Sequence, residues 1–236
     1  MKLGLMQPYF FPYIGYYQLI HAVDTFIIYD TVNYIKTSWI KRNRYLLNGS
    51  SKFFTLSIKN ASSNKLIIDT YIADEDLLHS KDKIAKTIRM AYSKAPYFDE
   101  VFPFLNSLIQ FEEDNISNYN THILLETCNY LNIDTEILQG SKVLTHSTST
   151  GQDRVIEICK SFNADHYINP IGGVELYENE AFTNYGISLL FLKTDDDLEY
   201  NQWGDLFIPN LSIIDVLMFN SKWEIAHLLE KYCLIN

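Results

Sequence analysis

Residues 1–30 decide the fold and read MKLGLMQPYFFPYIGYYQLIHAVDTFIIYD. Residues 2–6 and 25–30 are short apolar runs with β-branched or aromatic side chains, which is typical of buried strands. Between them, residues 15–23 carry apolar side chains at the spacing of a helix. A strand, a helix and a second strand within 30 residues predict a βαβ unit, in which the two strands run parallel.

The rest of the chain continues the α/β pattern, with a helical stretch in the middle. We predict strands at residues 53–59, 66–72, 166–169 and 187–192, and helices at 84–95, 100–111, 116–131, 154–162 and 222–232. Thr150 with Asp153, and Ser212 with Asp215, have the spacing of capping boxes at helix starts. The sequence therefore predicts an α/β fold with a mainly parallel sheet built from βαβ units. A helical insertion around residues 78–132 belongs to the same single domain, residues 1–236.

Composition excludes several classes of protein. The chain has 29 acidic and 19 basic residues and a net charge of −10, which argues against a general nucleic-acid binder and against DNA as a partner. Its apolar runs are too short for a membrane span, and its start does not read as a signal peptide. The three cysteines lack metal-ligand spacing. We expect a cytoplasmic protein without a membrane span, a metal or a tightly bound cofactor, and the sequence identifies no cofactor.

The loop after the first predicted strand is the richest candidate for a site. It reads QPYFFPYIGYY over residues 7–17 and should lie at the carboxyl end of that strand, where parallel sheets bind ligands. Gln7 offers an amide that both donates and accepts, and Tyr13 offers a phenol and a stacking face. The alternative is an aromatic hinge that packs against the helical insertion.

Residues 36–44, KTSWIKRNR, form a dense basic segment after Asp30. Arginine matches phosphate oxygens in a bidentate way, and Trp39 can stack on a base or a sugar. The residues expected to bind substrate here are Lys36, Trp39, Arg42, Asn43 and Arg44. The alternative is a solvated edge strand whose cations prevent edge-to-edge pairing.

A third segment, NPIGGVELY at residues 169–177, runs from a predicted strand into a Gly-Gly pair. Backbone N–H groups at Gly172 and Gly173 would face an anion or an oxyanion, with Tyr177 nearby; a plain left-handed turn explains the same residues. Asp195–Asp197 has the composition of a magnesium site, but such a charge run is usually a solvated loop.

Several stretches of the chain resemble the WbqC-like family of bacterial proteins. The resemblance is carried by residues 6–46, MQPYFFPYIGYYQLIHAVDTFIIYDTVNYIKTSWIKRNRYL, and continues through HSKDKIAKTIRMAYSKAPYF, RVIEICKSFNADHYINPIGGVELYENEAF and FIPNLSIIDVLMFN. The family often carries Trp at the position of Tyr13. The residues that match its motifs are Gln7, Pro8, Tyr13, Gly15, Asp24, Asp30, Trp39, Arg42, Asn43, Arg44, Gly172, Gly173, Tyr177, Ser212 and Asp215.

This resemblance implies a role in making bacterial surface polysaccharide, commonly the O-antigen of lipopolysaccharide. It implies an amide-forming N-acyl or aminoacyl transferase, glycyl among the candidates, that acts on a nucleotide-linked amino sugar. The amine needs a general base, for which we expect Asp30 or else His79. The oxyanion would be stabilised by Gln7, by Asn43 or by the backbone N–H groups of Gly172 and Gly173. The acyl donor stays open between a glycyl- or other aminoacyl-tRNA, a carrier-protein thioester, a coenzyme A thioester and ATP-activated glycine, and the acidic composition weighs against tRNA. A non-catalytic sugar-nucleotide or partner-binding protein of the same pathway, or a nucleotidyl transferase-like enzyme, are the alternatives.

Overall fold

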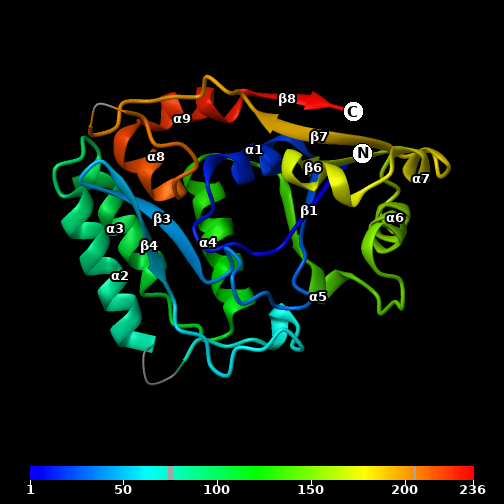
Figure 1. Cartoon of the computed structure of the whole chain (residues 1–236), viewed down its shortest axis with the longest axis horizontal. Coiled ribbons are helices and arrows are strands. Elements are labelled where there is room, and N and C mark those ends of the chain that lie inside the picture. The colour runs from blue at the N-terminus through cyan, green and yellow to red at the C-terminus, as the bar shows by residue number, and fades with distance from the viewer. Residues whose placement is uncertain (74–76, 205) are drawn as a thin grey trace.

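The structure, a computed structural model, describes residues 1–73, 77–204 and 206–236. A six-stranded sheet forms its centre and a two-stranded hairpin stands apart from that sheet (Figure 1). The strands are β1 (Lys2–Met6), β2 (Thr25–Ile28), β3 (Arg42–Leu47), β4 (Ser50–Thr55), β5 (Glu136–Gln139), β6 (His166–Pro170), β7 (Ser188–Thr194) and β8 (Tyr232–Ile235). The α-helices are α1 (Ile14–Ala22), α2 (Leu77–Tyr92), α3 (Phe98–Ile109), α4 (Ile116–Tyr130), α5 (Gly140–Val143), α6 (Gly151–Ser161), α7 (Asn179–Thr183), α8 (Ile213–Phe219) and α9 (Lys222–Leu229), and the 3-10 helices are η1 (Ile67–Asp69) and η3 (Ile171–Leu176).

The sheet has the strand order β5-β2-β1-β6-β7-β8. The first five strands run parallel and β8 is antiparallel to β7, which confirms the predicted mainly parallel sheet. The predicted βαβ unit is β1–α1–β2, with Leu3 opposite Thr25. From β1 the chain moves to β2 on one side, whereas from β6 it moves to β7 on the other side. The two connections therefore diverge between the neighbouring strands β1 and β6.

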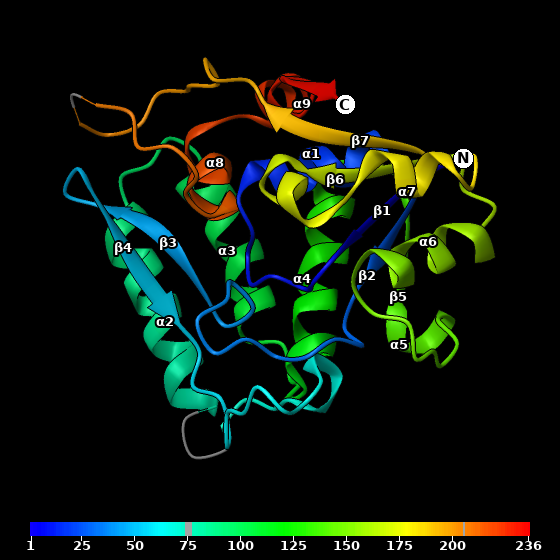
Figure 2. The same cartoon turned by 45° about the vertical axis from the view of Figure 1, so that its right-hand side comes forward.

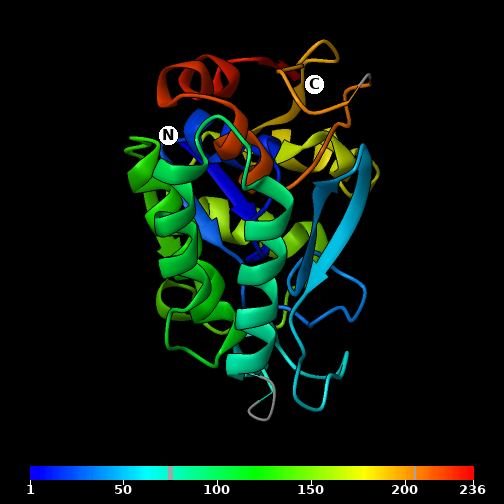
Figure 3. The same ribbon diagram turned by 90° about the vertical axis from the view of Figure 1, so that its left-hand side faces the viewer.

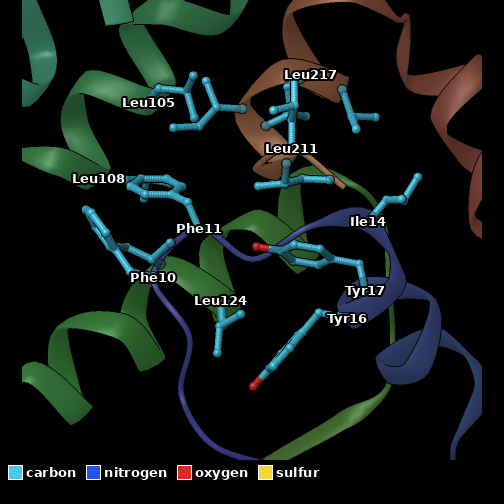
Figure 4. Packing of buried hydrophobic residues seen from close by; sticks show 14 of the residues in the cluster. Phe10, Phe11, Ile14, Tyr16, Tyr17, Leu105, Leu108, Leu124, Leu211 and Leu217 are labelled. Atoms are coloured by element: carbon cyan, nitrogen blue, oxygen red, sulfur yellow. The ribbon is translucent and has the colours of Figure 1, made fainter. Parts of the chain in front are cut away.

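Both faces of the sheet are covered, because side chains along a strand alternate between the faces. Phe26 and Ile28 belong to one buried cluster with residues of α1, α3, α4 and α8, whereas Ile27 belongs to a second cluster with residues of α6. Figure 4 shows part of the larger cluster, where Phe10 and Phe11 lie near Leu108 of α3. The loop that follows β1 is thus anchored in the core by its own aromatic side chains.

The helices α2, α3 and α4 fill the predicted helical insertion. They run side by side, and the β3–β4 hairpin lies at their edge (Figure 3). Tyr92 of α2 connects the hairpin and α8 to the helical insertion. Its hydroxyl accepts a hydrogen bond from the backbone N–H of Leu46 in β3 at 2.9 Å and donates one to Asp215 of α8 at 2.8 Å. No helix in the described ranges is both long and apolar enough to cross a membrane.

Of the two strands predicted at residues 53–59 and 66–72, the first overlaps β4 at residues 53–55 and the second is wrong. The actual pair is the β3–β4 hairpin, closed by Asn48 and Gly49 with positive φ angles of 50° and 68°. An Asn-Gly pair with positive φ at both positions forms the tight turn that matches the twist of a hairpin. Residues 66–72 instead form η1 and isolated bridges, one of them between Asn33 and Leu66.

Other boundaries also differ from the prediction. The strands β5 and β8 were not predicted, and the last helix ends at Leu229 because the chain then turns to pair with β7. Thr150 precedes α6 without a side-chain capping bond. Ser212 does accept a hydrogen bond from the backbone N–H of Ile214, but Asp215 does not reciprocate, since its carboxylate accepts from other side chains.

Candidate functional site

A cavity of about 800 Å³ lies at the carboxyl ends of β1, β6 and β7. Met6 and Gln7 line it from the end of β1, Asn169 and Pro170 from the end of β6, and Thr194 from the end of β7. The cavity therefore sits where the connections from β1 and β6 diverge. Parallel α/β sheets bind ligands at this switch point, because the loops on either side turn away from each other and leave a crevice.

The loop that follows β1 forms one wall and is held by side chains from distant parts of the chain. The Asn43 side-chain amide donates to the carbonyl oxygens of Phe10 at 3.0 Å and Phe11 at 2.8 Å. The Ser212 hydroxyl also donates to Phe11, at 2.7 Å. Phe11 needs this support, because its φ of 43° lies in the left-handed region that residues other than glycine rarely adopt. Asn43 thus lines the cavity, but its side-chain NH2 group is already bonded to the loop and holds the loop in shape.

Gln7 and Tyr13 come from this loop and both line the cavity. Gln7 is half-buried, and no hydrogen bond to its side-chain amide is found within the described ranges. Burial raises the pKa of the Tyr13 phenol above 10.0, so the phenol stays protonated near neutral pH and acts as a hydrogen-bond donor. The two side chains thus offer neutral polar groups at the carboxyl end of β1.

The β3–β4 hairpin supplies a cation and an aromatic face. In Figure 2 it stands beside α2, at some distance from the central sheet. Arg44 and Trp39 line the cavity, and the Arg44 guanidinium carbon lies 5.6 Å from the centre of the Trp39 ring. The guanidinium donates to the carbonyl oxygen of Asn210 at 2.9 Å. It makes no ion pair with a carboxylate of the described residues, so its charge is free to meet an anion.

Arg42 and Lys36 lie outside the cavity wall. Arg42 donates to the carbonyl oxygen of Thr37 at 2.8 Å, and its guanidinium carbon lies 4.8 Å from the centre of the Phe53 ring. Lys36 is exposed. The basic segment predicted from the sequence therefore divides, with Arg44 and Trp39 at the cavity and Arg42 and Lys36 beyond its rim.

The opposite wall comes from the end of β6 and from η3. A Cβ atom on Gly173 would stand 1.9 Å from Nδ2 of Asn169, so any larger residue there would displace the Asn169 side chain. A Cβ atom added to Gly172, in contrast, would have no other atom within 4 Å. The Asn169 side chain is fixed by Tyr167, whose hydroxyl donates to Oδ1 at 3.1 Å, and by its own donation to the carbonyl oxygen of Pro170 at 3.1 Å. Tyr177, also predicted, lines the cavity on this side.

Asp30 lies elsewhere, fully buried between the end of β2, α4 and the start of α5. Its Oδ2 accepts hydrogen bonds from the hydroxyls of Ser117 and Ser141 and from the Gln139 amide, at 2.7–2.9 Å. Its Oδ1 accepts from the backbone N–H of Ser141 at 2.7 Å. Asp30 does not line the cavity, and both its oxygens are occupied, so this geometry favours a structural role over that of a base. Asp30 therefore lies at the carboxyl edge of the sheet, as predicted, but at the end of a strand that does not border the cavity.

His79 is also separate from the cavity. It is exposed in the first turns of α2, and the cavity wall contains no residue of that helix. Neither residue expected to act as a base therefore faces the cavity, and the described residues that line it include one carboxylate, Asp196. Asp196 accepts a hydrogen bond from the Lys193 ammonium at 2.7 Å, and this contact raises the pKa of Lys193 above 10.5.

Some wall residues were not among those predicted. Thr194, Lys193 and Asn210 come from β7 and from the loop that follows it. Thr194 could have been found from the sequence, because it follows the predicted strand at residues 187–192 and ligands bind at the carboxyl ends of parallel strands. No local signal points to Asn210, which reaches the cavity only because the chain returns to it before α8.

Comparisons with known proteins agree with the earlier resemblance. The model of the WbqC-like protein family matches residues 7–227, a range that contains all the described cavity-lining residues except Leu5 and Met6. The chain is also similar to the uncharacterized protein Rv1507c of Mycobacterium tuberculosis, with 27% identity over 235 residues that cover 98% of each chain. No solved structure matches.

Proposed function

The chain belongs to the WbqC-like protein family, and we propose that it transfers an acyl or aminoacyl group to the amine of a nucleotide-linked amino sugar. The observation that carries this proposal is the cavity at the switch point between β1 and β6, where aromatic faces, amide groups and an unpaired guanidinium meet. The family resemblance adds the setting, which is the synthesis of bacterial surface polysaccharide such as O-antigen.

The nucleotide half of the substrate fits the hairpin side of the cavity. Arg44 presents a planar fork of N–H donors, which suits the oxygens of a pyrophosphate. Trp39 lies beside it at the rim of the cavity. Tyr13 and Tyr177 add apolar faces and phenol donors on the two walls. A nucleoside diphosphate sugar combines these same features, a flat base, two phosphates and a ring with hydroxyl groups.

The reaction requires few groups from the protein. The amine nitrogen attacks the acyl carbon, the new C–N bond forms, and the bond from that carbon to the carrier's oxygen or sulfur breaks. The amine gives up a proton, which ends on the released carrier atom. Asp196 is the carboxylate in the cavity wall that can take this proton first, and the free Gln7 amide can donate to the oxyanion. These roles replace those that the sequence suggested for Asp30 and His79.

A thermal-shift screen tests the proposal with UDP-, dTDP- and GDP-linked amino sugars and their hydroxy analogues. A ligand at a hundredfold excess over its dissociation constant adds about 2.7 kcal/mol to the free energy of unfolding, or roughly 5–10 °C in Tm for a chain of this size. We expect one amino sugar nucleotide to give such a shift, and Arg44→Ala to abolish it. Arg42→Ala is the matched control, because Arg42 also lies over an aromatic ring of the hairpin side but outside the cavity. A shift lost equally in both variants, or none with any sugar nucleotide, would contradict the pyrophosphate site.

A second candidate is a protein that binds the sugar nucleotide without turnover. One observation favours it: the described residues of the cavity wall include no histidine and no cysteine, and Asp30 and His79 lie outside that wall. Mass spectrometry separates the two functions once a ligand is known. Incubation with that amino sugar nucleotide and each donor class yields an N-acylated product if the protein is a transferase. Binding with no mass change for any donor identifies a binding protein.

A further inference from the structure

The charge of this chain is unevenly distributed along the sequence. Residues 31–68 contain seven lysines and arginines and no aspartate or glutamate. The rest of the chain carries 12 basic and 29 acidic residues. The net charge of −10 therefore conceals one cationic region, which spans the hairpin and the loops on either side of it.

Two of these cations and two aromatic side chains form a platform on and beside the hairpin. Arg44 is directly opposite Phe53 in the β3–β4 ladder, and Arg42 is two residues away on β3, so the three side chains share one face. Trp39 stacks against Phe53 with ring centres 6.1 Å apart and an angle of 28° between the planes. We call Trp39, Arg42, Arg44 and Phe53 the hairpin platform.

The hairpin platform is open to a ligand. The side chains of Trp39 and Phe53 are 37% and 52% exposed, although both are large aromatics that folding normally covers. Neither arginine forms an ion pair with a carboxylate of the described residues. Lys36 is exposed a few residues before Trp39, and Lys41 directly precedes Arg42. Aromatic faces and unneutralised cations are thus concentrated in one place.

This platform continues into the cavity, since Trp39 and Arg44 belong to both. A ligand that lies on the platform can therefore place its end inside the cavity. An acyl donor for the proposed reaction needs this arrangement, because its carrier is large and its reactive group is small.

We propose that the hairpin platform binds the single-stranded 3′ end of an RNA that carries an aminoacyl ester, and that this RNA is the acyl donor. The inference rests on the proposed transferase function. Single-stranded nucleic acids bind where aromatic side chains stack on bases and a basic groove follows the phosphates, because every base has a π-face. An acidic carrier protein would use the cations but not two exposed stacked rings. The net charge does not oppose this partner, because the acidic residues lie outside the segment that would touch it.

Fluorescence anisotropy with a labelled 12-nucleotide RNA ending in CCA tests the inference in the absence of any sugar nucleotide. The same RNA as a blunt duplex controls for charge alone. We expect the single strand to bind more tightly than the duplex, with an affinity that falls as salt rises from 50 to 200 mM. Trp39→Ala should weaken binding about tenfold, the loss of one stacked base. Replacing Lys36 and Lys41 by alanine should reduce the slope of log affinity against log salt by about 1.4.

Two features of the design guard against misfolding and non-specific charge effects. Lys36→Glu changes an exposed side chain, so it reports on RNA binding even if Trp39→Ala fails to fold. Lys222→Ala is the matched control, because the Lys222 ammonium lies 3.6 Å from the centre of the Tyr130 ring, on a different part of the surface. Its RNA affinity should equal that of the wild type.

The outcomes separate this inference from the proposed function. Failure to bind the RNA, or equal binding by wild type, Trp39→Ala and Lys36→Glu, overturns the inference. So does polyglutamate that competes with the RNA at equal concentration, which would point to an acidic protein partner instead. A thermal shift with a sugar nucleotide in the same preparation would leave the proposed sugar-nucleotide site intact in either case. The inference is established if the single strand binds more tightly than the duplex, and if this binding is weakened in Trp39→Ala and Lys36→Glu but kept in Lys222→Ala.

Discussion

Replacement of Asp30 by asparagine distinguishes a structural carboxylate from a catalytic one. The side chains have nearly the same shape, but asparagine offers one accepting oxygen where aspartate offers two. Three donors converge on Oδ2 of Asp30, and the backbone N–H of Ser141 points at Oδ1. The hydroxyls can rotate to accept from a new NH2 group, but the Gln139 amide at 2.9 Å and the Ser141 N–H cannot. Whichever way the asparagine turns, one N–H group faces another.

The expected cost follows from these contacts. A hydrogen bond to a charged group contributes about 1.5–3 kcal/mol, and a buried donor left without a partner costs about 1–3 kcal/mol. The lost negative charge also faces the first turn of α4, where an anion contributes up to about 1 kcal/mol. Because neighbouring effects overlap, we expect Asp30→Asn to lower the free energy of unfolding by roughly 3–5 kcal/mol in total. This corresponds to a Tm about 10 °C lower for a chain of this length.

Urea denaturation and the thermal-shift assay with the amino sugar nucleotide should be run on the same variant. Asp24→Asn is the matched control: Asp24 is exposed and accepts one hydrogen bond, from the backbone N–H of Lys2 at 2.7 Å, which the asparagine oxygen can still accept. We expect that control to change stability by about 0.5 kcal/mol or less. Folded Asp30→Asn should keep the ligand-induced shift, because Asp30 lies outside the cavity. Unchanged stability together with abolished formation of the N-acylated product would instead identify Asp30 as a catalytic base.

Three further predictions concern the loop after β1, the turn after β6 and one buried carboxyl group. Asn43→Ala removes the donor shared by the Phe10 and Phe11 carbonyls and should cost about 2–4 kcal/mol in a urea titration; Asn48→Gly, in the hairpin turn, should stay near the wild-type value. Gly173→Ala should displace Asn169 and weaken sugar-nucleotide binding, with about 1–3 kcal/mol lost from stability, whereas Gly172→Ala, which has open space, should do neither. Burial raises the pKa of Asp215 above 3.8, so the folded protein binds this proton more tightly than the unfolded chain does. Its contribution to the free energy of unfolding therefore increases as the pH falls through the folded pKa toward 3.8. The stability of the wild type should rise relative to that of Asp215→Asn as the pH is lowered from 7 to 3.8, and an unchanged or opposite difference would contradict the raised pKa.

The central strands could be predicted because their signals are local. β1, β2 and β7 contain compact apolar runs, which are typical of strands covered on both faces in a parallel sheet, and the short β6 has Tyr167 and Ile168 at its buried centre. The hairpin was missed although Asn48-Gly49 is a strong turn signal, because its strands carry cations and serines in place of an alternating apolar pattern. β8 was missed for the opposite reason. Its residues continue the apolar pattern of α9, and only the pairing with β7 ends the helix at Leu229.

The site required knowledge that no local pattern contains. Asp30 and Gln7 both follow parallel strands, so the rule on carboxyl ends selects them equally. What separates them is the neighbour of each strand. β2 lies next to β5, whose end brings Gln139 and Ser141 onto Asp30 and fills that position. β1 lies next to β6, and because their connections diverge, the position beside Gln7 stays open. The pairing of β1 with β6 joins residues more than 160 positions apart, so a carboxyl end that binds a ligand can be told from one that is filled only once the strand order is known.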